Sequence, residues 1–234
     1  MTLYFERHDG QAVTCDDFAQ AIADANPGSD LSRLLPQFKR WYSQAGTPRL
    51  QAQGVYDAAA RSYTLTLAQS CAPTPGQPAK EPFVIPVSLG LLGVDGQDLP
   101  LQLDGETVPA AGTRTVVLTQ VHESFTFVNI DAEPVPSILR GFTAPVVLDF
   151  AYTDAQLLHL LAHDSDPFNR WEAGQRLAVN QAVNAIQSIA GNAHPACASV
   201  LNDAYLDAMR QVLRHPSLDS AFKDLVLTLP SETY

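Results

Sequence analysis

The sequence predicts a multidomain fold of α and β type, in which an immunoglobulin-like β-sandwich lies between an N-terminal helical segment and a C-terminal α-helical array. Proline provides the first signal: two of the seventeen prolines lie in residues 1–45, eleven in residues 46–152 and four in residues 153–234. Because proline is confined to loops, strand edges and first helical turns, the middle region must consist of short, interrupted segments. The second signal is hydrophobic periodicity, which is helical in both flanks and alternating in the middle.

The N-terminal flank is expected to form two helices. Thr14-Cys15-Asp16-Asp17 predicts a helix start, because the Thr14 hydroxyl can accept from the Asp17 amide and acidic residues suit a helix N-terminus. Asn26-Pro27-Gly28 ends this helix, and a second helical segment follows before Gly46. Since short helices gain most of their stability from packing, we expect the flank to bury its apolar side chains against the sandwich or another copy. The side chains concerned are Phe5, Phe18, Ile22 and Phe38.

The middle region alternates apolar and polar residues, as strands with one buried face do. Tyr63, Leu65 and Leu67 alternate with threonines, and Phe125 and Phe127 flank Thr126. Further strands are expected over residues 50–56, 83–92, 115–120, 138–142 and 146–152. About seven short strands in this length predict two packed sheets.

The C-terminal flank is expected to form four helices joined by short loops. Thr153-Asp154-Ala155-Gln156 is a capping box, and Asp166-Pro167 resembles an N-cap followed by proline at the first helical position. This second helix should end at Gly191, and two more should cover residues 197–214 and 218–227. The loop lengths predict antiparallel helical pairs.

Composition excludes several functional classes. The 234 residues include 14 Lys and Arg against 25 Asp and Glu, giving a net charge of −11 that opposes binding to nucleic acid or to an anionic membrane. No apolar run approaches the roughly 18 residues needed to span a bilayer. Three scattered cysteines, Cys15, Cys71 and Cys197, fit neither zinc pairs nor a disulfide scaffold. We therefore expect a soluble, cytoplasmic protein.

One residue pair has the spacing of a helical metal site. His159 and His163 stand four residues apart, on one helix face, as zinc ligands on a helix require. However, the metalloprotease form needs Glu directly after the first His, where this sequence has Leu160, and no third ligand is apparent. We therefore favour a capped amphipathic helix with two partly exposed histidines.

The remaining candidates for chemistry are also incomplete. Arg7-His8-Asp9-Gly10 is interpreted as a turn with salt-bridged neighbours, because it has no accompanying nucleophile. Cys15 would begin a helix, but the acidic residues that follow oppose thiolate formation. Four aromatic residues lie at positions where the periodicity of their segments places apolar side chains, so we expect them in the core. They are Trp41, Phe125, Phe127 and Trp171. We thus assign no catalytic, cofactor-binding or metal-binding residue to this chain.

Three separated strings resemble the bacterial aminopeptidase N family, which comprises zinc aminopeptidases of the gluzincin type. Residues 3–18, LYFERHDGQAVTCDDF, are similar to the stretch that follows the family's metal-binding helices. Residues 38–48, FKRWYSQAGTP, are similar to its junction into a β-domain, and residues 168–173, FNRWEA, to its helical C-terminal region. The strings have the family's order and spacing, and residues 31–37 resemble a local insertion.

This resemblance implies three parts. Residues 1–46 would be the helical end of a thermolysin-like catalytic domain, residues 47–152 an immunoglobulin-like domain, and residues 153–234 the first helices of the C-terminal domain. Zinc and the motifs that hold it would lie in parts of the intact enzyme outside this chain. The chain would be a noncatalytic fragment of an enzyme that hydrolyses N-terminal residues from peptides, and its partner would be the rest of its own catalytic domain. The alternative is a free-standing Ig-like and helical protein-interaction module without enzymatic activity.

Overall fold

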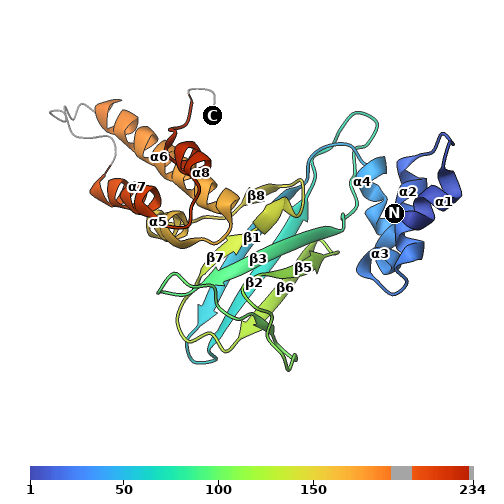
Figure 1. Ribbon diagram of the computed structural model, residues 1–234, viewed down its shortest axis with the longest axis horizontal. Helices are drawn as coiled ribbons and strands as arrows, with labels where there is room; N and C mark the ends of the chain where they lie inside the picture. The colour runs from blue at the N-terminus through green and yellow to red at the C-terminus, as the bar shows by residue number, and fades with distance from the viewer. Residues whose placement is uncertain (191–201, 232–234) are drawn as a thin grey trace.

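The computed structural model describes residues 1–190 and 202–231, which form three parts in a row along the chain (Figure 1). A group of short helices lies at one end, a β-sandwich in the middle and a helical array at the other end. The predicted fold class, an Ig-like sandwich flanked by helices, is therefore confirmed. No helix within the described ranges is long and apolar enough to cross a membrane.

The N-terminal segment contains α1 (Thr2–His8), α2 (Cys15–Ala25), α3 (Asp30–Phe38) and α4 (Arg40–Ser43). The predicted capping box is present, since Thr14 Oγ1 accepts from the Asp17 amide while the Asp17 carboxylate accepts from the Thr14 amide. Helix α1 includes Arg7 and His8, so only Asp9 and Gly10 of the turn expected over residues 7–10 lie in a turn. The helix has no side-chain cap and is held instead by packing on α2, where the Arg7 guanidinium pairs with Asp24 at 2.6 Å.

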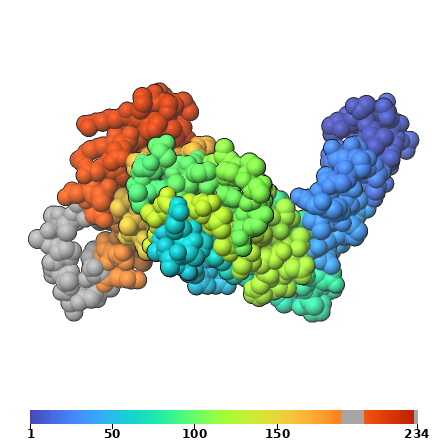
Figure 2. All heavy atoms as spheres, turned by 90° about the horizontal axis from the view of Figure 1, so that it is seen from below, coloured from blue at the N-terminus to red at the C-terminus, as the bar shows by residue number. Residues whose placement is uncertain are grey.

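The expected burial against the sandwich is wrong for Phe5, Phe18 and Phe38. Phe5 and Phe18 remain 53% and 39% exposed, and the Phe18 ring contacts Tyr4 at 5.1 Å between ring centroids. Phe38 packs instead within the segment, on a small cluster of Ala19, Ala23 and Leu35. Figure 2 shows the reason, because this segment projects away from the sandwich and reaches it only at one end.

The sandwich consists of two sheets. The five-stranded sheet has the order β4-β6-β2-β1-β8 and the three-stranded sheet the order β5-β3-β7. The strands are β1 (Arg49–Asp57), β2 (Ser62–Ser70), β3 (Ile85–Leu92), β4 (Gln102–Leu103), β5 (Arg114–Leu118), β6 (His122–Val128), β7 (Val135–Ile138) and β8 (Val147–Asp149). Strand β8 pairs in parallel with β1, whereas β2 pairs antiparallel with both β1 and β6.

The alternation in the sequence matches the pleat of the sheets. Tyr63, Leu65 and Leu67 on β2 point into the core between the sheets, together with Phe127 on β6. Strand β3 is buried along almost its whole length. Leu89 and Leu91 belong to the core of the sandwich, whereas the last residue, Leu92, packs into the core of the helical array. The same strand therefore links the two cores.

The expected strand over residues 138–142 is wrong after Ile138. Strand β7 ends there, and residues Arg140–Phe142 form a 3-10 helix. Leu139 and Phe142 adopt positive φ angles of 63° and 54°, which strands do not allow and which side chains other than glycine rarely adopt. The chain is turned out of the sheet at this point, toward the helical array.

The helical array consists of α5 (Asp154–His163), α6 (Pro167–Ala190), α7 (Asp203–Arg214) and α8 (Ser220–Leu227). The predicted capping box of α5 forms between Thr153 and Gln156, and the Asp166 carboxylate accepts from the Asn169 amide at the start of α6. The array has its own core around Leu160, Leu161 and Leu177. The expected stop at Gly191 and the first residues of the helix expected over 197–214 lie outside the described residues.

Candidate functional site

Two polar joints connect the sandwich to its helical neighbours through side-chain hydrogen bonds between segments far apart in the sequence. The first joint lies between helices α3 and α4 and the segment before β3. Trp41 Nε1 donates to the Val84 carbonyl at 2.8 Å, and its ring packs 4.7 Å from the Phe83 ring. Gln37 Nε2 donates to the carbonyls of Pro82 at 3.2 Å and Thr119 at 2.6 Å.

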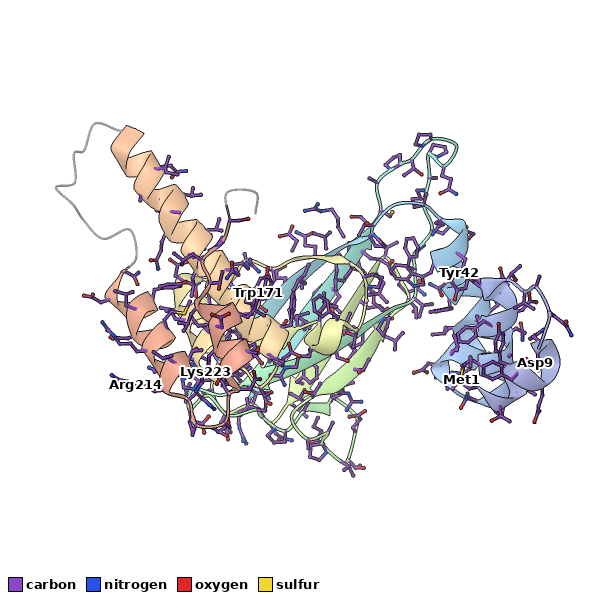
Figure 3. All side chains as sticks on the ribbon, turned by 45° about the horizontal axis from the view of Figure 1, so that its top comes forward. Met1, Asp9, Tyr42, Trp171, Arg214 and Lys223 are labelled. Carbon is purple, nitrogen blue, oxygen red and sulfur yellow. The ribbon has the colours of Figure 1, made fainter. Side chains whose placement is uncertain are left out.

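The backbone that receives these hydrogen bonds is itself fixed from the opposite side. Gln69 on β2 is buried, its Nε2 donates to the Phe83 carbonyl at 2.9 Å, and its Oε1 accepts from the Phe83 amide at 2.7 Å. Tyr42, the neighbour of Trp41, is labelled in Figure 3 at the narrow connection between the helical segment and the sandwich. Because both sides of the segment are hydrogen-bonded, α4 is held at one defined position on the sandwich.

The second joint is centred on Arg140, which is only 3% exposed. Its Nη2 pairs with the carboxylates of Asp98 at 2.7 Å and Asp164 at 3.0 Å. Its Nε donates to Ser137 Oγ and its Nη1 to Thr113 Oγ1, both at 2.9 Å. Asp98 and Thr113 belong to the sandwich, while Asp164 follows α5, so one guanidinium connects the two parts.

The sequence accommodates this guanidinium with a glycine. Gly90 on β3 lies directly beneath it, and a Cβ atom at this position would overlap the Arg140 side chain. Two further contacts stabilise the strained turn that carries Arg140: the Gly141 amide donates to Asp166 at 2.9 Å, and Asn169 Nδ2 donates to the Ile138 carbonyl at 3.1 Å. Residues at the start of α6 thus hold the left-handed turn in place.

The electrostatics of the second joint depend on burial. Burial raises the pKa of the Asp164 carboxyl, and the neighbouring Arg140 guanidinium opposes this shift. Among the described residues, Asp164 Oδ2 and Arg170 Nη1 are buried without a hydrogen-bond partner. Each of these charges therefore depends strongly on its remaining contacts, because an uncompensated buried charge is costly.

A cavity of about 260 Å³ lies beside this joint, between α6 and the segment that leads into β8. Its walls are mostly aliphatic, and Phe142 at its edge is 65% exposed while its ring lies 3.8 Å from that of Phe168. Arg176 also lines the cavity, where it donates to the Phe150 carbonyl and lies over the Tyr152 ring. The described residues that line the cavity include no nucleophile paired with a base.

The histidine pair of the sequence lies on one face of α5, with ring centroids 5.0 Å apart. His159 Nε2 lies 2.9 Å from the Gly93 carbonyl, a contact in which the imidazole must donate. No group of three or more His, Cys, Asp or Glu side chains in residues 1–190 and 202–231 is arranged to hold a metal ion. Within the described residues, the pair therefore has no third metal ligand arranged beside it.

The other sequence candidates are dispersed. His8 contacts Tyr4 on α1, and Cys15 is exposed at the start of α2. Phe127 is fully buried, and Trp41 and Trp171 pack on the sandwich core and the array core respectively, as expected. The sequence did not reveal Arg140, although an arginine within an apolar strand-like run, followed by glycine, could have indicated a buried ion pair.

Comparison with known proteins matches the sandwich and the helical array to two domain families. Residues 46–151 match DUF3458, a domain of unknown function with an Ig-like fold, and residues 154–234 match DUF3458_C, a domain described as ARM repeats. Aminopeptidase N of Escherichia coli (strain K12) is 40% identical over 232 residues, and that of Caulobacter vibrioides is 42% identical over 230 residues. The chain is thus similar to bacterial aminopeptidases N over nearly its whole length.

The matches to aminopeptidase N cover nearly all of this chain but only part of each relative. The chain spans about a quarter of the length of the curated relatives, including a Haemophilus influenzae aminopeptidase N that is 36% identical over 233 residues. A crystal structure of Legionella pneumophila aminopeptidase A in complex with aspartic acid covers 97% of this chain, with a TM-score of 0.74 and 25% identity. This chain covers 23% of that structure. The region shared with the relatives is the Ig-like and helical region.

Proposed function

We propose that this chain is a noncatalytic region of a zinc-dependent aminopeptidase N, whose intact form hydrolyses N-terminal residues from peptides. The observation that carries this proposal is the 36–42% identity over nearly the whole chain to about a quarter of three bacterial aminopeptidases N. In this proposal, residues 1–46 are the helical end of a thermolysin-like catalytic domain. Residues 47–152 are the immunoglobulin-like domain, and residues 153–234 are the first helices of the C-terminal domain.

The role we assign to the region is to hold the helical array at a defined position relative to the catalytic domain. The two polar joints support this role, because each fixes one end of the sandwich through several hydrogen bonds to side chains of low exposure. Trp41 anchors the sandwich to the N-terminal helices, and Arg140 anchors it to the array. The array would then help to enclose the chamber in which peptides are cleaved.

Zinc and the peptide-binding groups belong, in this proposal, to the rest of the intact enzyme. We assign no zinc to the His159 and His163 pair, because His159 is bonded to the Gly93 carbonyl and the described residues around the pair offer no third ligand. The partners are peptide substrates for the intact enzyme and the rest of the catalytic domain for this chain. We place the enzyme in the cytoplasm, without a nucleic-acid or membrane partner.

The gene around this chain provides the most direct test. A longer reading frame that encodes a His-Glu-x-x-His helix upstream would support the proposal. A ribosome-binding site directly before Met1, without that motif upstream, would favour the free-standing interaction module. Purified chain and longer product should then be compared on aminoacyl reporter substrates, where we expect turnover only from the longer product and loss of that turnover with a chelator.

Contact with the catalytic domain can be tested separately through the N-terminal helices. Phe5 and Phe18 form an exposed apolar surface with Tyr4, which the rest of the catalytic domain would cover. Phe18→Ser should therefore reduce the yield or thermal stability of the longer product more than that of the isolated chain. Val108→Ser, at a residue that is 73% exposed on the sandwich, is the control. Equal losses for Phe18→Ser in both proteins would contradict this contact.

A further inference from the structure

A tight turn of the sandwich lies against the last two turns of α5. The turn is closed by two hydrogen bonds, from the Gly96 amide to the Gly93 carbonyl and from the Gly93 amide to the Gln97 carbonyl, both at 2.9 Å. The Gly93 carbonyl also accepts from His159 Nε2 at 2.9 Å. The first histidine of the pair thus extends the hydrogen bonding of the turn into the helical array.

The second histidine packs against the same turn. Gly96 has a φ of +79°, and a Cβ atom at this position would overlap the His163 ring. The contact therefore needs glycine for two reasons, its backbone conformation and its lack of a side chain. Because the rings of His159 and His163 are 5.0 Å apart, the two imidazoles form one contact surface between the array and the turn.

Burial and most of the neighbouring charges oppose the protonation of His163. Burial against the turn lowers its pKa, and His159 on α5, Arg170 on α6 and His215 after α7 lower it further. Asp95 in the turn is the opposing neighbour and favours the charged form. The position of His163 at the end of α5 also favours a cation, through the helix dipole.

We propose that this contact is a proton-sensitive latch, which holds the helical array on the sandwich while His163 is neutral and loosens when His163 takes up a proton. A proton on His163 would add a positive charge beside His159, Arg170 and His215, at the point where α5 meets the turn. His163 is exposed beyond its contact with the turn, so solvent protons reach it directly, and solvent screening keeps the effect modest. The ion cluster of Arg140 lies next in the chain, at Asp164, and would keep the array attached after the latch has loosened.

The direction of the pH dependence follows from the lowered pKa. The neutral form is favoured in the folded contact relative to the unfolded chain, where the ordinary histidine value is 6.5. The latch is therefore fully closed above that value, and its contribution to stability is lost as the pH falls from 6.5 through the pKa of His163 in the folded protein.

The full chain can be tested by nuclear magnetic resonance and amide hydrogen exchange. We expect the His163 ring to titrate with a midpoint below 6.5, and the Gly96 amide signal to shift with the same midpoint. The opening equilibrium of the Leu160 and Leu161 amides, obtained from their hydrogen-exchange rates after correction for intrinsic exchange, should increase several-fold as the pH is lowered from about 7 to about 5. A His163 midpoint at or above 6.5 would overturn the proposal.

Variants separate the latch from general effects of acid. His163→Asn should abolish the several-fold difference in opening, whereas His122→Asn, at the exposed first residue of strand β6 in the sandwich, should retain it. If His163→Asn does not fold, His163→Gln provides the same neutral side chain with a different length. A pH difference that persists in the folded neutral variant would show that other groups control the opening, and would overturn the proposal.

Discussion

Replacement of Arg140 by methionine should weaken the attachment of the helical array to the sandwich and lower the free energy of unfolding. Methionine retains much of the apolar volume of arginine but removes its charge and all of its hydrogen bonds. The variant would leave Asp164, whose side chain is fully buried, without the cation 3.0 Å away, and would also remove the donors to Ser137 and Thr113. Breaking a buried ion pair by removing one partner costs about 3–5 kcal/mol, because the other charge remains in a desolvated site.

The loss should depend on pH in a direction set by Asp164. Burial raises the pKa of this carboxyl, and removal of Arg140 removes the interaction that opposes the shift. The folded variant then holds a proton on Asp164 more tightly than the unfolded chain does, so acid reduces the deficit. The deficit grows as the pH rises from the ordinary carboxyl value of 3.8 and levels off above the folded pKa.

Urea unfolding of the full chain at several pH values measures both effects. Arg210→Met is the matched control, because Arg210 forms an exposed ion pair with Asp207 and its loss should change the unfolding free energy by less than about 1 kcal/mol. Adding Asp164→Asn to Arg140→Met should recover part of the loss, since it removes the uncompensated charge. A loss below about 1 kcal/mol for Arg140→Met, or a deficit that grows in acid, would refute the argument from the buried pair.

Two further substitutions and a metal analysis test other parts of the structure. Gly90→Ala should destabilise the chain by about 3 kcal/mol in urea unfolding, because its methyl group displaces the guanidinium above it; a loss as small as that of an exposed substitution would contradict the close approach. Trp41→Phe should cost about 1–2 kcal/mol, since the Val84 carbonyl loses its donor while an aromatic ring remains. Metal analysis after dialysis should find no stoichiometric zinc in this chain; one zinc per chain, lost on replacing His159 and His163, would overturn that expectation.

Two controls keep these results specific. Tyr42→Phe alters the exposed aromatic neighbour of Trp41 on the same short helix and should change the unfolding free energy by less than about 0.5 kcal/mol. An equal loss in both variants would mean that the Trp41 hydrogen bond contributes little. For zinc, the double replacement of His159 and His163 distinguishes a site at this pair from adventitious metal elsewhere.

Local signals in the sequence predicted the elements that depend on near neighbours. The capping boxes at Thr14 and Thr153 and the cap at Asp166 involve residues three positions apart, so residue types alone predict them. The alternation of Tyr63, Leu65 and Leu67 likewise identifies a strand and its buried face. Proline density located the sandwich, because proline restricts the backbone wherever it occurs.

Tertiary structure alone decided the features that depend on distant partners. Helix α1 has no side-chain cap and is held by α2, through contacts such as that of Arg7 with Asp24. Leu139 adopts a left-handed conformation that its own residue type disfavours, and the contacts that hold its turn come from the start of α6. The Gln37 side chain donates to the backbone carbonyls of Pro82 and Thr119, which lie 45 and 82 residues away in the sequence. These contacts join residues that are far apart in the sequence and come together only in the folded chain. A single sequence therefore contains no local pattern from which they could be predicted.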